Sequence, residues 1–400
     1  MERLNQHFTG VAAKYFSKVD ATRNSNQHEI GSNAFSQILG HPGHNTMVLA
    51  GSFFYFCDDS EEPLRALGTL SWYDARRHNP NRSAELRLYY PENIVTARMT
   101  EGDFCIVAVK PDRSVMVIVA SAGSTAERQL RWLFDIDVVN DSRFKVHDVG
   151  AQRQVSLIEE LILAELGVES RQDNDNWLDS IIGRFGETFP TTAEFSHFAR
   201  ETCPEQFDLA QDSDAALMGW MVHEEMLFRT FERSIVQQQL DSGFRDVDHF
   251  ISVSLSVQNR RKSRVGYALE HHLAAVFSGN KLLFGRQVVT EKKSTADFLF
   301  PGGQAYHNPA YPDESLVMLA SKSTCKDRWR QVLAEADRIL RKHLFTLEPA
   351  ISSHQTDEMQ HHHVQLVVPE AVRGSYTAAQ QGWIMNLSEY IGFVRDTVKR

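Results

Sequence analysis

The stretch Leu316–Lys342, which reads LVMLASKSTCKDRWRQVLAEADRILRK, decides the fold of the second half of this chain of 400 residues. Its first part is a short apolar run that predicts a buried strand, and this strand ends at Lys322. A basic and aromatic turn follows, and the next residues predict an amphipathic helix that carries Glu335. Upstream, Asp297 stands at the start of a second apolar run, Ala296–Phe300. The sequence therefore predicts two neighbouring strands and a helix that bring two carboxylates and a lysine together.

These residue types suit the hydrolysis of a phosphodiester. Mg²⁺ held by the carboxylates of Asp297 and Glu335 would neutralise charge at the phosphate, while Lys322 would position the attacking water. Glu270 lies on a helix predicted for Gly266–Phe277 and could add a further ligand or support one. We therefore treat these four residues as a candidate catalytic set, with the three carboxylates as the candidate metal ligands.

Each residue of the set also has a structural alternative. Asp297 could be a turn residue, and Lys322 could end its strand with its ammonium group extended to solvent. Glu335 could be a helix surface residue paired with Arg338 or Lys342. Spacing alone does not separate these alternatives from a catalytic role.

Length and composition limit the class of protein. Four hundred residues predict two domains, and the apolar content of 42% is ordinary for a globular protein. No apolar run is long enough to span a bilayer, and the first residues lack the features of a signal peptide, so we expect no membrane and a cytoplasmic location. The four cysteines form no CxxC pair, which argues against a disulfide framework or a zinc site.

The net charge of −10 argues against a protein that simply coats nucleic acid, but local basic patches are present. They lie at Arg260–Arg264 (RRKSR), at Lys326–Arg330 (KDRWR) and within Asp74–Arg87. Each patch alone could be an ordinary solvated surface. A second polar segment, Lys18–Asn33, is rich in side chains that can read base edges, although it could equally be a surface loop.

The first 155 residues predict a β-rich unit, because short apolar or alternating runs are separated by turn-rich segments. Helices are predicted near Asn33–Leu39, at Thr125–Leu133 and at Val155–Leu166, and a polar, acidic connection follows. We place the domain boundaries at 1–165, 166–188 (linker) and 189–400. The predicted strands are Thr46–Cys57, Ala66–Tyr73, Leu86–Tyr90, Phe104–Val109 and Ser114–Ala120.

The second half predicts a mixed α/β unit, because helical and strand patterns alternate. The predicted helices are Ala215–Leu240, Val247–Val257, Gly266–Phe277 and Arg328–His343. The predicted strands are Leu282–Val289, Asp297–Phe300, Leu316–Ala320, Leu344–Leu347 and Val364–Val368.

Four blocks of the second half resemble the EcoRII-type restriction endonucleases in order and spacing. They are NRRKSRVGYALEHHL (Asn259–Leu273), ADFLFPGGQAYH (Ala296–His307), LASKSTCKDRWRQVLAEAD (Leu319–Asp337) and HLFTL (His343–Leu347). The resemblance implies a PD-(D/E)xK restriction-endonuclease-like domain, with a mixed sheet flanked by helices, after an N-terminal DNA-binding pseudobarrel. The N-terminal half matches only in its strand pattern and polar arms.

The resemblance also implies roles for single residues. Asp297, Lys322 and Glu335 fall on the nuclease signature with its glutamate moved to a later segment, and Glu270 matches a further acidic position. Two departures are present. Ala296 stands where proline is usual, and Ala320 stands two residues before the lysine, where a carboxylate is usual. The second departure is expected if Glu335 replaces that carboxylate.

Lys326, Asp327 and Arg328 match the segment with which similar enzymes read CC:GG half-sites in the major groove. The chemistry agrees, since cations donate to guanine and a carboxylate accepts from cytosine N4. The alternative is an ordinary basic helix start. Arg330 would contact phosphate, and the basic residues Arg260, Arg261 and Arg264 are further candidates for contact with DNA. Trp220 could stack on a flipped base, or it could be a core residue of its helix.

The sequence and the resemblance together predict a magnesium-dependent, homodimeric type II restriction endonuclease of a prokaryotic cytoplasm. It would cut double-stranded DNA at a palindromic CC–GG-containing site to leave 5′-phosphates, and the N-terminal domain would bind a second, effector DNA. The alternatives are a catalytically inactive DNA-binding protein and a nonspecific repair nuclease. The residues expected to bind effector DNA are Lys18, Arg23, Asn26, His28, Arg76, Arg77 and Arg82.

Overall fold

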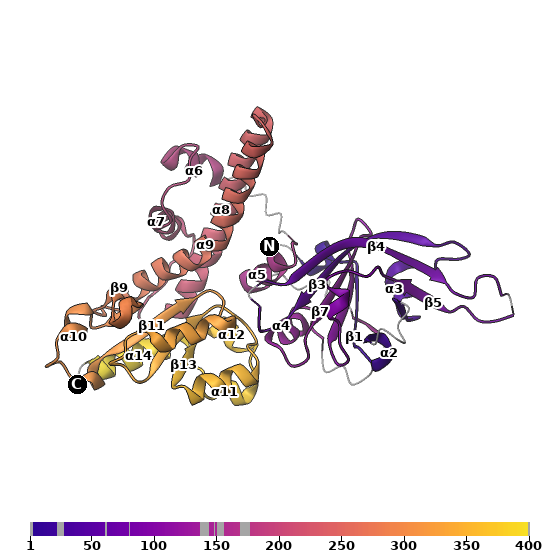
Figure 1. Ribbon diagram of the computed structural model, residues 1–400. Coiled ribbons are helices and arrows are strands. Elements are labelled where there is room, and N and C mark those ends of the chain that lie inside the picture. Colours follow the sequence, from indigo (N-terminus) through magenta and orange to yellow (C-terminus); the bar gives the residue numbers. More distant parts are fainter. Residues whose placement is uncertain are drawn as a thin grey trace. The chain divides into compact units, whose positions relative to one another are not determined.

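The computed structural model describes residues 3–21, 28–60, 62–79, 81–136, 144–147, 149, 156–168 and 177–398. For residues 19, 21 and 326–328 the description is limited to the backbone. The chain forms two compact units (Figure 1), namely Met1–Ser170 with Ala350–Ser352, and Arg171–Pro349 with Ser353–Arg400. None of the described helices is long and apolar enough to cross a membrane.

The first unit is built on a sheet that has eight strands in the described residues, in the order β2-β5-β4-β3-β7-β6-β1-β8. All neighbouring strands are antiparallel except β3 and β7, which are parallel. The strands are β1 (Gly10–Tyr15), β2 (Glu29–Gly31), β3 (Met47–Phe56), β4 (Leu64–Asp74), β5 (Leu86–Tyr89), β6 (Phe104–Val109), β7 (Val115–Ala120) and β8 (Lys145–His147). The helices are α1 (Leu4–His7), α2 (Lys18–Ala21), α3 (Phe35–Leu39), α4 (Thr125–Leu133) and α5 (Leu157–Glu165), with a 3₁₀ turn η1 at Thr96–Arg98. The β-rich first unit and its five predicted strands are confirmed.

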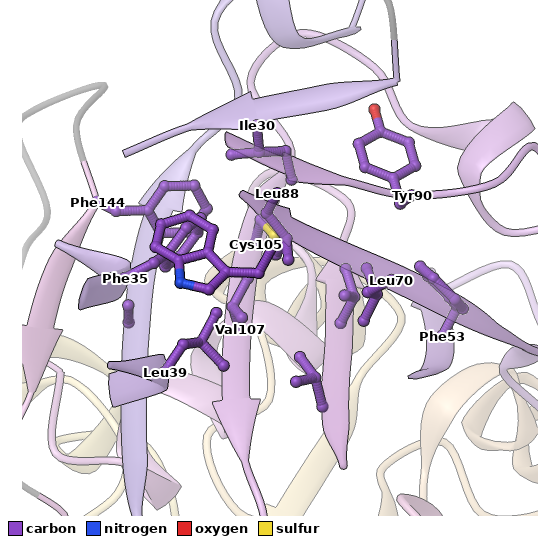
Figure 2. Close-up of a cluster of buried hydrophobic side chains, with 14 of the residues drawn as sticks. Ile30, Phe35, Leu39, Phe53, Leu70, Leu88, Tyr90, Cys105, Val107 and Phe144 are labelled. Atoms are coloured by element: carbon purple, nitrogen blue, oxygen red, sulfur yellow. The ribbon is translucent and has the colours of Figure 1, made fainter. Parts of the chain in front are cut away.

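Strands β6 and β7 of this sheet are apolar and buried at every position because both of their faces are covered. Successive side chains of a strand point to opposite faces. On β6, Phe104 and Ile106 therefore enter one core with residues of α4 and α5, such as Leu130 and Leu163. Cys105 and Val107 enter a second core on the other face (Figure 2). That second core also contains Phe35, Leu39, Leu70, Leu88 and Phe144.

The second unit begins with helices α6 (Leu178–Phe185), α7 (Thr192–Thr202), α8 (Ser213–Ser242) and α9 (Val247–Gly279). Part of the expected linker 166–188 is thus the packed helix α6, because Ile181 is fully buried in an aromatic cluster with α7 and α8. The two helices expected at Val247–Val257 and Gly266–Phe277 are one continuous helix. The basic residues between them contain no proline, and Arg and Lys favour helix.

A five-stranded mixed sheet forms the centre of the second unit, in the order β13-β12-β11-β10-β9. Strands β9 (Gly285–Val289), β10 (Thr295–Phe300) and β11 (Val317–Lys322) are antiparallel neighbours. Strands β11, β12 (Lys342–Thr346) and β13 (Val364–Val367) run parallel. Helices α9 and α14 (Leu387–Val398) both contact β11, which confirms a mixed sheet flanked by helices. The shorter elements are α10 (Gly303–His307), α11 (Ser353–His361), α12 (Glu370–Arg373), α13 (Ala378–Gln381) and the 3₁₀ turns η3 (Glu291–Lys293) and η4 (Asp313–Ser315).

The α-helix expected at Arg328–His343 is wrong. The chain forms a 3₁₀ helix instead, η5 (Lys326–Ala334), and β12 already begins at Lys342. Side chains three residues apart are eclipsed in a 3₁₀ helix, and the buried residues Trp329, Val332 and Glu335 follow that period. Ala336 then has a positive φ of 51°, which ends any helix at this point.

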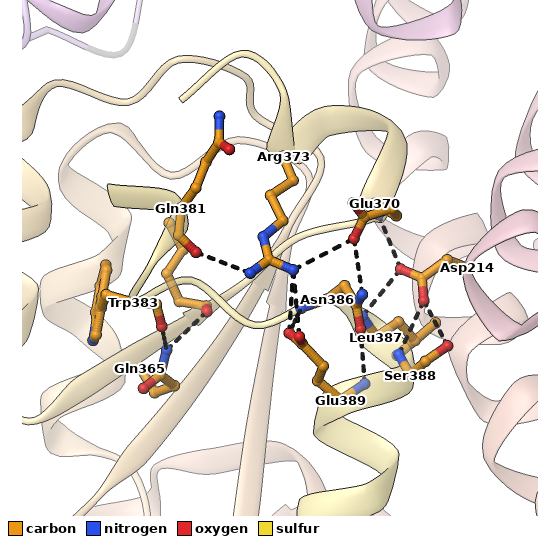
Figure 3. Close-up of polar contacts among 11 residues, drawn as sticks. Asp214, Gln365, Glu370, Arg373, Gln381, Trp383, Asn386, Leu387, Ser388 and Glu389 are labelled. Atoms are coloured by element: carbon orange, nitrogen blue, oxygen red, sulfur yellow. Dashed lines mark hydrogen bonds and ion pairs between the residues drawn. The ribbon is translucent and has the colours of Figure 1, made fainter. Parts of the chain in front are cut away.

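Asp214, in the first turn of α8, connects that helix to the C-terminal part of the unit (Figure 3). Its carboxylate accepts hydrogen bonds from the backbone N–H groups of Glu370, Leu387 and Ser388, and from the Ser388 hydroxyl. The N–H groups at a helix start have no partner within the helix, so a carboxylate placed there stabilises it. Asp214 thus supports the first turns of both α12 and α14.

Candidate active site

Asp297 and Lys322 meet across the antiparallel strands β10 and β11. The pairing of Phe298 with Leu319 places Asp297 opposite Ala320. The Oδ2 atom of Asp297, a residue only 7% exposed, accepts hydrogen bonds from the backbone N of Ser321 (2.8 Å) and from Lys322 Nζ (3.1 Å). The strand adjacency expected from the sequence is therefore confirmed, and Lys322 is paired with the carboxylate rather than extended freely into solvent.

Glu335 lies at the end of η5 in an extended conformation and is buried. Burial raises the pKa of its carboxyl group to about 7; the positive charge of Lys322 opposes this shift and the negative charge of Asp297 adds to it. Its Oε2 atom is buried without a hydrogen-bond partner among the described residues. A buried carboxyl oxygen without a partner is costly, so this atom is suited to a ligand that the protein alone does not supply.

Glu270, on α9, approaches the same pair of residues from the helix side. Burial raises the pKa of its carboxyl group, and the negative charge of Asp297 raises it further. Gln287, on β9, connects the two carboxylates, since its Nε2 donates to Glu270 Oε2 (3.0 Å) and to Asp297 Oδ1 (3.1 Å). The four residues expected in the catalytic set are thus close enough to interact electrostatically.

These oxygens fit a hard divalent cation such as Mg²⁺, which prefers carboxylate oxygen and often uses only one or two protein carboxylates. Within the described part of the chain, no group of three or more His, Cys, Asp and Glu side chains is already arranged as a metal site. The fit therefore rests on the carboxylates of Asp297 and Glu335 and on the unpartnered Glu335 oxygen. Glu270 Oε2 accepts a hydrogen bond from Gln287 and lies 3.7 Å from Arg286 Nη2.

Lys342 holds the segment that carries Glu335, whereas the sequence analysis considered it only as a possible surface partner of the Glu335 side chain. The side chain is 6% exposed, and Nζ donates to the carbonyl oxygens of Glu335 (2.5 Å), Ala336 (3.0 Å) and Ile339 (2.9 Å). Burial lowers the pKa of its ammonium group. The alternative in which Glu335 pairs with Lys342 on a helix surface is wrong, because both residues are buried and Lys342 donates to the backbone carbonyl of Glu335.

The residues expected to read DNA lie on η5. Lys326, Asp327 and Arg328 form its first turn, and their side chains lie outside the described atoms. Arg330 lies half exposed over the ring of Trp329 (4.9 Å), and its Nη2 pairs with a carboxylate of α11, Glu358 Oε2 (2.8 Å).

The other basic and aromatic candidates of this unit are used for packing. Arg264 is buried, with its guanidinium 3.9 Å from the ring centroid of Phe228 and paired with Glu225. Arg261 Nε donates to Glu232 Oε2 (2.7 Å), and the Arg260 guanidinium lies 4.2 Å from the ring centroid of Phe189. Trp220 is 9% exposed and packs beside Phe207 and His272, as its core alternative requires.

The effector candidates lie on two segments of the first unit. Lys18 is exposed on α2, and His28, with a φ of 58°, contacts the ring of Tyr90. Arg23 and Asn26 lie outside the described residues. On the second segment Arg82 is exposed, whereas Arg76 pairs with Glu85 (2.6 Å) and Arg77 lies over the ring of Tyr73.

Comparison with known proteins finds similarity in the part of the chain that carries these residues. Residues 228–391 match the family model described as EcoRII C terminal. The chain is 41% identical over 204 residues to the type II restriction enzyme EcoRII of Escherichia coli, a match that covers 51% of this chain and 50% of that enzyme. The chain thus spans about half the length of the curated relative that it matches.

Among solved structures, metal-depleted Ecl18kI in complex with uncleaved, modified DNA aligns with a TM-score of 0.47 at 14% identity, over 57% of this chain and 86% of that one. A complex of the restriction endonuclease PspGI with substrate DNA aligns with a TM-score of 0.43 at 12% identity, over 53% of this chain and 94% of that one.

The mixed sheet, with Asp297 and Lys322 on its antiparallel strands, lies in the part of the chain that matches the EcoRII C-terminal family model. The resemblance to EcoRII-type restriction endonucleases is thereby confirmed for this part of the chain.

Proposed function

We propose that this protein is a type II restriction endonuclease that hydrolyses double-stranded DNA at a palindromic CC–GG-containing site and leaves 5′-phosphate ends. One observation carries the proposal. In the domain matched by the EcoRII C-terminal family, Asp297, Lys322, Glu335 and Glu270 form one electrostatically coupled group, and Glu335 keeps a buried oxygen without a partner among the described residues. Perturbed carboxyl groups that meet a lysine in this way are typical of functional sites.

Asp297 and Glu335 would hold Mg²⁺, and Glu270 would assist. When bound there, Mg²⁺ supplies charge neutralisation at the reacting phosphate and promotes ionisation of water. Lys322, whose ammonium group lies 3.1 Å from Asp297 Oδ2, orients the attacking water and adds positive charge beside the phosphate. The buried surroundings of Glu335 strengthen every electrostatic interaction at the site, because little water competes there.

We assign recognition of the CC:GG half-site to Lys326, Asp327 and Arg328. Their chemistry supports this assignment: Lys and Arg donate to guanine O6 and N7, and a carboxylate accepts from cytosine N4. Arg330 would contact phosphate, and in doing so it would exchange its ion pair with Glu358 for the DNA backbone.

A palindromic target favours a twofold homodimer with one active site for each strand. The first unit would bind a second DNA copy and thereby regulate cleavage, through Lys18, Arg23, Asn26, His28, Arg76, Arg77 and Arg82. Such an enzyme would act in the cytoplasm of a prokaryotic cell. Arg260, Arg261, Arg264 and Trp220 are weaker candidates for DNA contact, because all four have intramolecular partners.

Digestion of plasmid DNA with Mg²⁺ tests the proposal. Discrete fragments are expected, and sequencing of their ends would give the site and the cut position. A smear would identify a nonspecific nuclease instead. DNA that is bound at a specific site but never cut, with any divalent metal, would identify a DNA-binding protein without catalysis.

The regulatory role of the first unit needs a separate experiment. Residues from about 170 onward are compared with the whole chain on DNA that carries a single site. The shortened chain is expected to cleave this substrate better, because no effector DNA is then needed. Equal or weaker cleavage by a folded, DNA-binding fragment would rule out the regulatory role while leaving the nuclease assignment intact.

A further inference from the structure

Gln287 occupies a strained position directly opposite Asp297. In the β9–β10 ladder Val288 pairs with Ala296 and Arg286 pairs with Phe298, so this register places Gln287 across from Asp297. Gln287 has a φ of 49°, a conformation that residues other than glycine rarely adopt. Backbone strain of this kind persists where the surrounding contacts hold it, and it is concentrated at functional sites.

The strained backbone directs one amide group to two carboxylates. Nε2 of Gln287 lies 3.0 Å from Glu270 Oε2 and 3.1 Å from Asp297 Oδ1. An amide nitrogen carries two hydrogens and can therefore donate to both oxygens at once. If the Gln287 amide were flipped, its oxygen would face two carboxylate oxygens and no hydrogen bond could form. The hydrogen-bond network therefore assigns the nitrogen to this position.

The same two oxygens are candidate ligands of the metal, and an amide N–H group cannot coordinate a cation. A cation that binds between Glu270 and Asp297 therefore has to displace Nε2. Displacement is feasible because Gln287 is exposed on β9, the edge strand of the sheet, and its side chain can leave without opening the core. A divalent cation also neutralises the two carboxylates more fully than a neutral amide does.

We propose, on the basis of the proposed metal-dependent function, that the Gln287 amide is a placeholder that holds Glu270 and Asp297 together until a divalent cation displaces it. Gln287 thereby sets the metal affinity of the site. The amide reduces repulsion between the two carboxylates in the metal-free protein, and breaking its two charge-assisted hydrogen bonds makes metal binding less favourable. Gln287 is a positioning residue and takes no part in the chemical step.

The experiment measures Mn²⁺ binding to the full chain without DNA, by calorimetry and by the rise in thermal unfolding temperature. Gln287→Ala is expected to bind Mn²⁺ about tenfold more tightly than the parent, since the lost hydrogen bonds to charged groups no longer compete. Gln287→Gly should bind equally tightly and be more stable than Gln287→Ala, because glycine tolerates the positive φ. Gln287→Lys places a fixed cation between the carboxylates and should abolish binding.

Val289→Ala is the matched control, because Val289 lies on the same strand and is 57% exposed; its Mn²⁺ affinity should equal that of the parent. Unchanged or weaker binding by Gln287→Ala and Gln287→Gly overturns the placeholder role, and weaker binding would mean that the amide turns and ligates the metal through its oxygen. If the parent binds no divalent cation at all, in the presence or absence of DNA, the proposed function itself fails.

Discussion

Replacement of Lys342 by Met should release the segment that carries Glu335. Met preserves most of the aliphatic stem but removes the ammonium group that donates to the carbonyl oxygens of Glu335, Ala336 and Ile339. These three carbonyls lie in a segment that is neither helix nor strand, and Ala336 holds a positive φ there. Few other contacts within the backbone can replace the lost ones.

The magnitude follows from two opposing effects. A hydrogen bond to a charged group contributes about 1.5–3 kcal/mol, and three are lost. The substitution also removes a buried ammonium group whose desolvation disfavours the charged form, as the lowered pKa of Lys342 indicates. We expect a net loss of about 3 kcal/mol in the local opening free energy of residues 335–342, and a large loss of cleavage with little change in DNA affinity.

Hydrogen exchange measured by mass spectrometry over residues 335–342, combined with plasmid cleavage, checks this expectation. A loss of about 3 kcal/mol corresponds to exchange that is faster by about two orders of magnitude. Arg341→Met is the control, because Arg341 is an exposed cation next to Lys342. Exchange and cleavage that match those of Arg341→Met would refute the argument that Lys342 positions Glu335.

Further predictions concern the chemical step, recognition and acid stability. Lys322→Ala should abolish cleavage while specific DNA binding, measured by gel shift, persists; unchanged cleavage would exclude Lys322 from the reaction. Asp327→Ala should reduce cleavage more than it reduces DNA affinity. An equal loss of both would contradict a coupling between recognition by this segment and catalysis. Burial lowers the pKa of His343 to about 3, below the unfolded value of about 6.5, so its contribution to stability is present above pH 6.5 and is lost as the pH falls toward 3. In denaturant unfolding, the stability of the parent relative to His343→Leu should therefore fall by about 2 kcal/mol between about pH 8 and about pH 5, because groups with raised pKa values, such as Glu335, contribute equally to both proteins; a difference between parent and variant that is the same at both pH values would contradict it.

The sequence predicted those parts of the fold that depend on local periodicity. Apolar runs located β3 to β7 and β9 to β13, and the adjacency of two of these strands brought Asp297 and Lys322 together. The prediction failed after Arg328, because the same apolar residues fit a helix of either period and the positive φ of Ala336 has no local signal. Helix α9 was predicted as two helices, because the basic segment RRKSR between them has no apolar periodicity; its arginines pair instead with acids of α8.

The two supporting residues were missed for reasons that lie outside local sequence. Gln287 reaches Asp297 only through the register of β9 on β10, and a pattern of single residues does not determine register. Lys342 is a buried lysine at the start of a strand, where its residue type alone predicts exposure. Its role becomes visible only when three carbonyl groups converge on it.

The three-residue period of η5 has a consequence for engineering new sequence specificity. Residues 326–328, proposed to read bases, begin the short 3₁₀ helix η5, and Glu335 directly follows its last residue; Trp329, Val332 and Glu335 are the buried residues that share the three-residue period. Inserting one residue after Arg328 would turn everything beyond it by about 120°. Glu335 would then leave the buried edge. Libraries that alter specificity should therefore exchange side chains at constant length, whereas natural relatives with a longer reading segment would need to add residues in multiples of three.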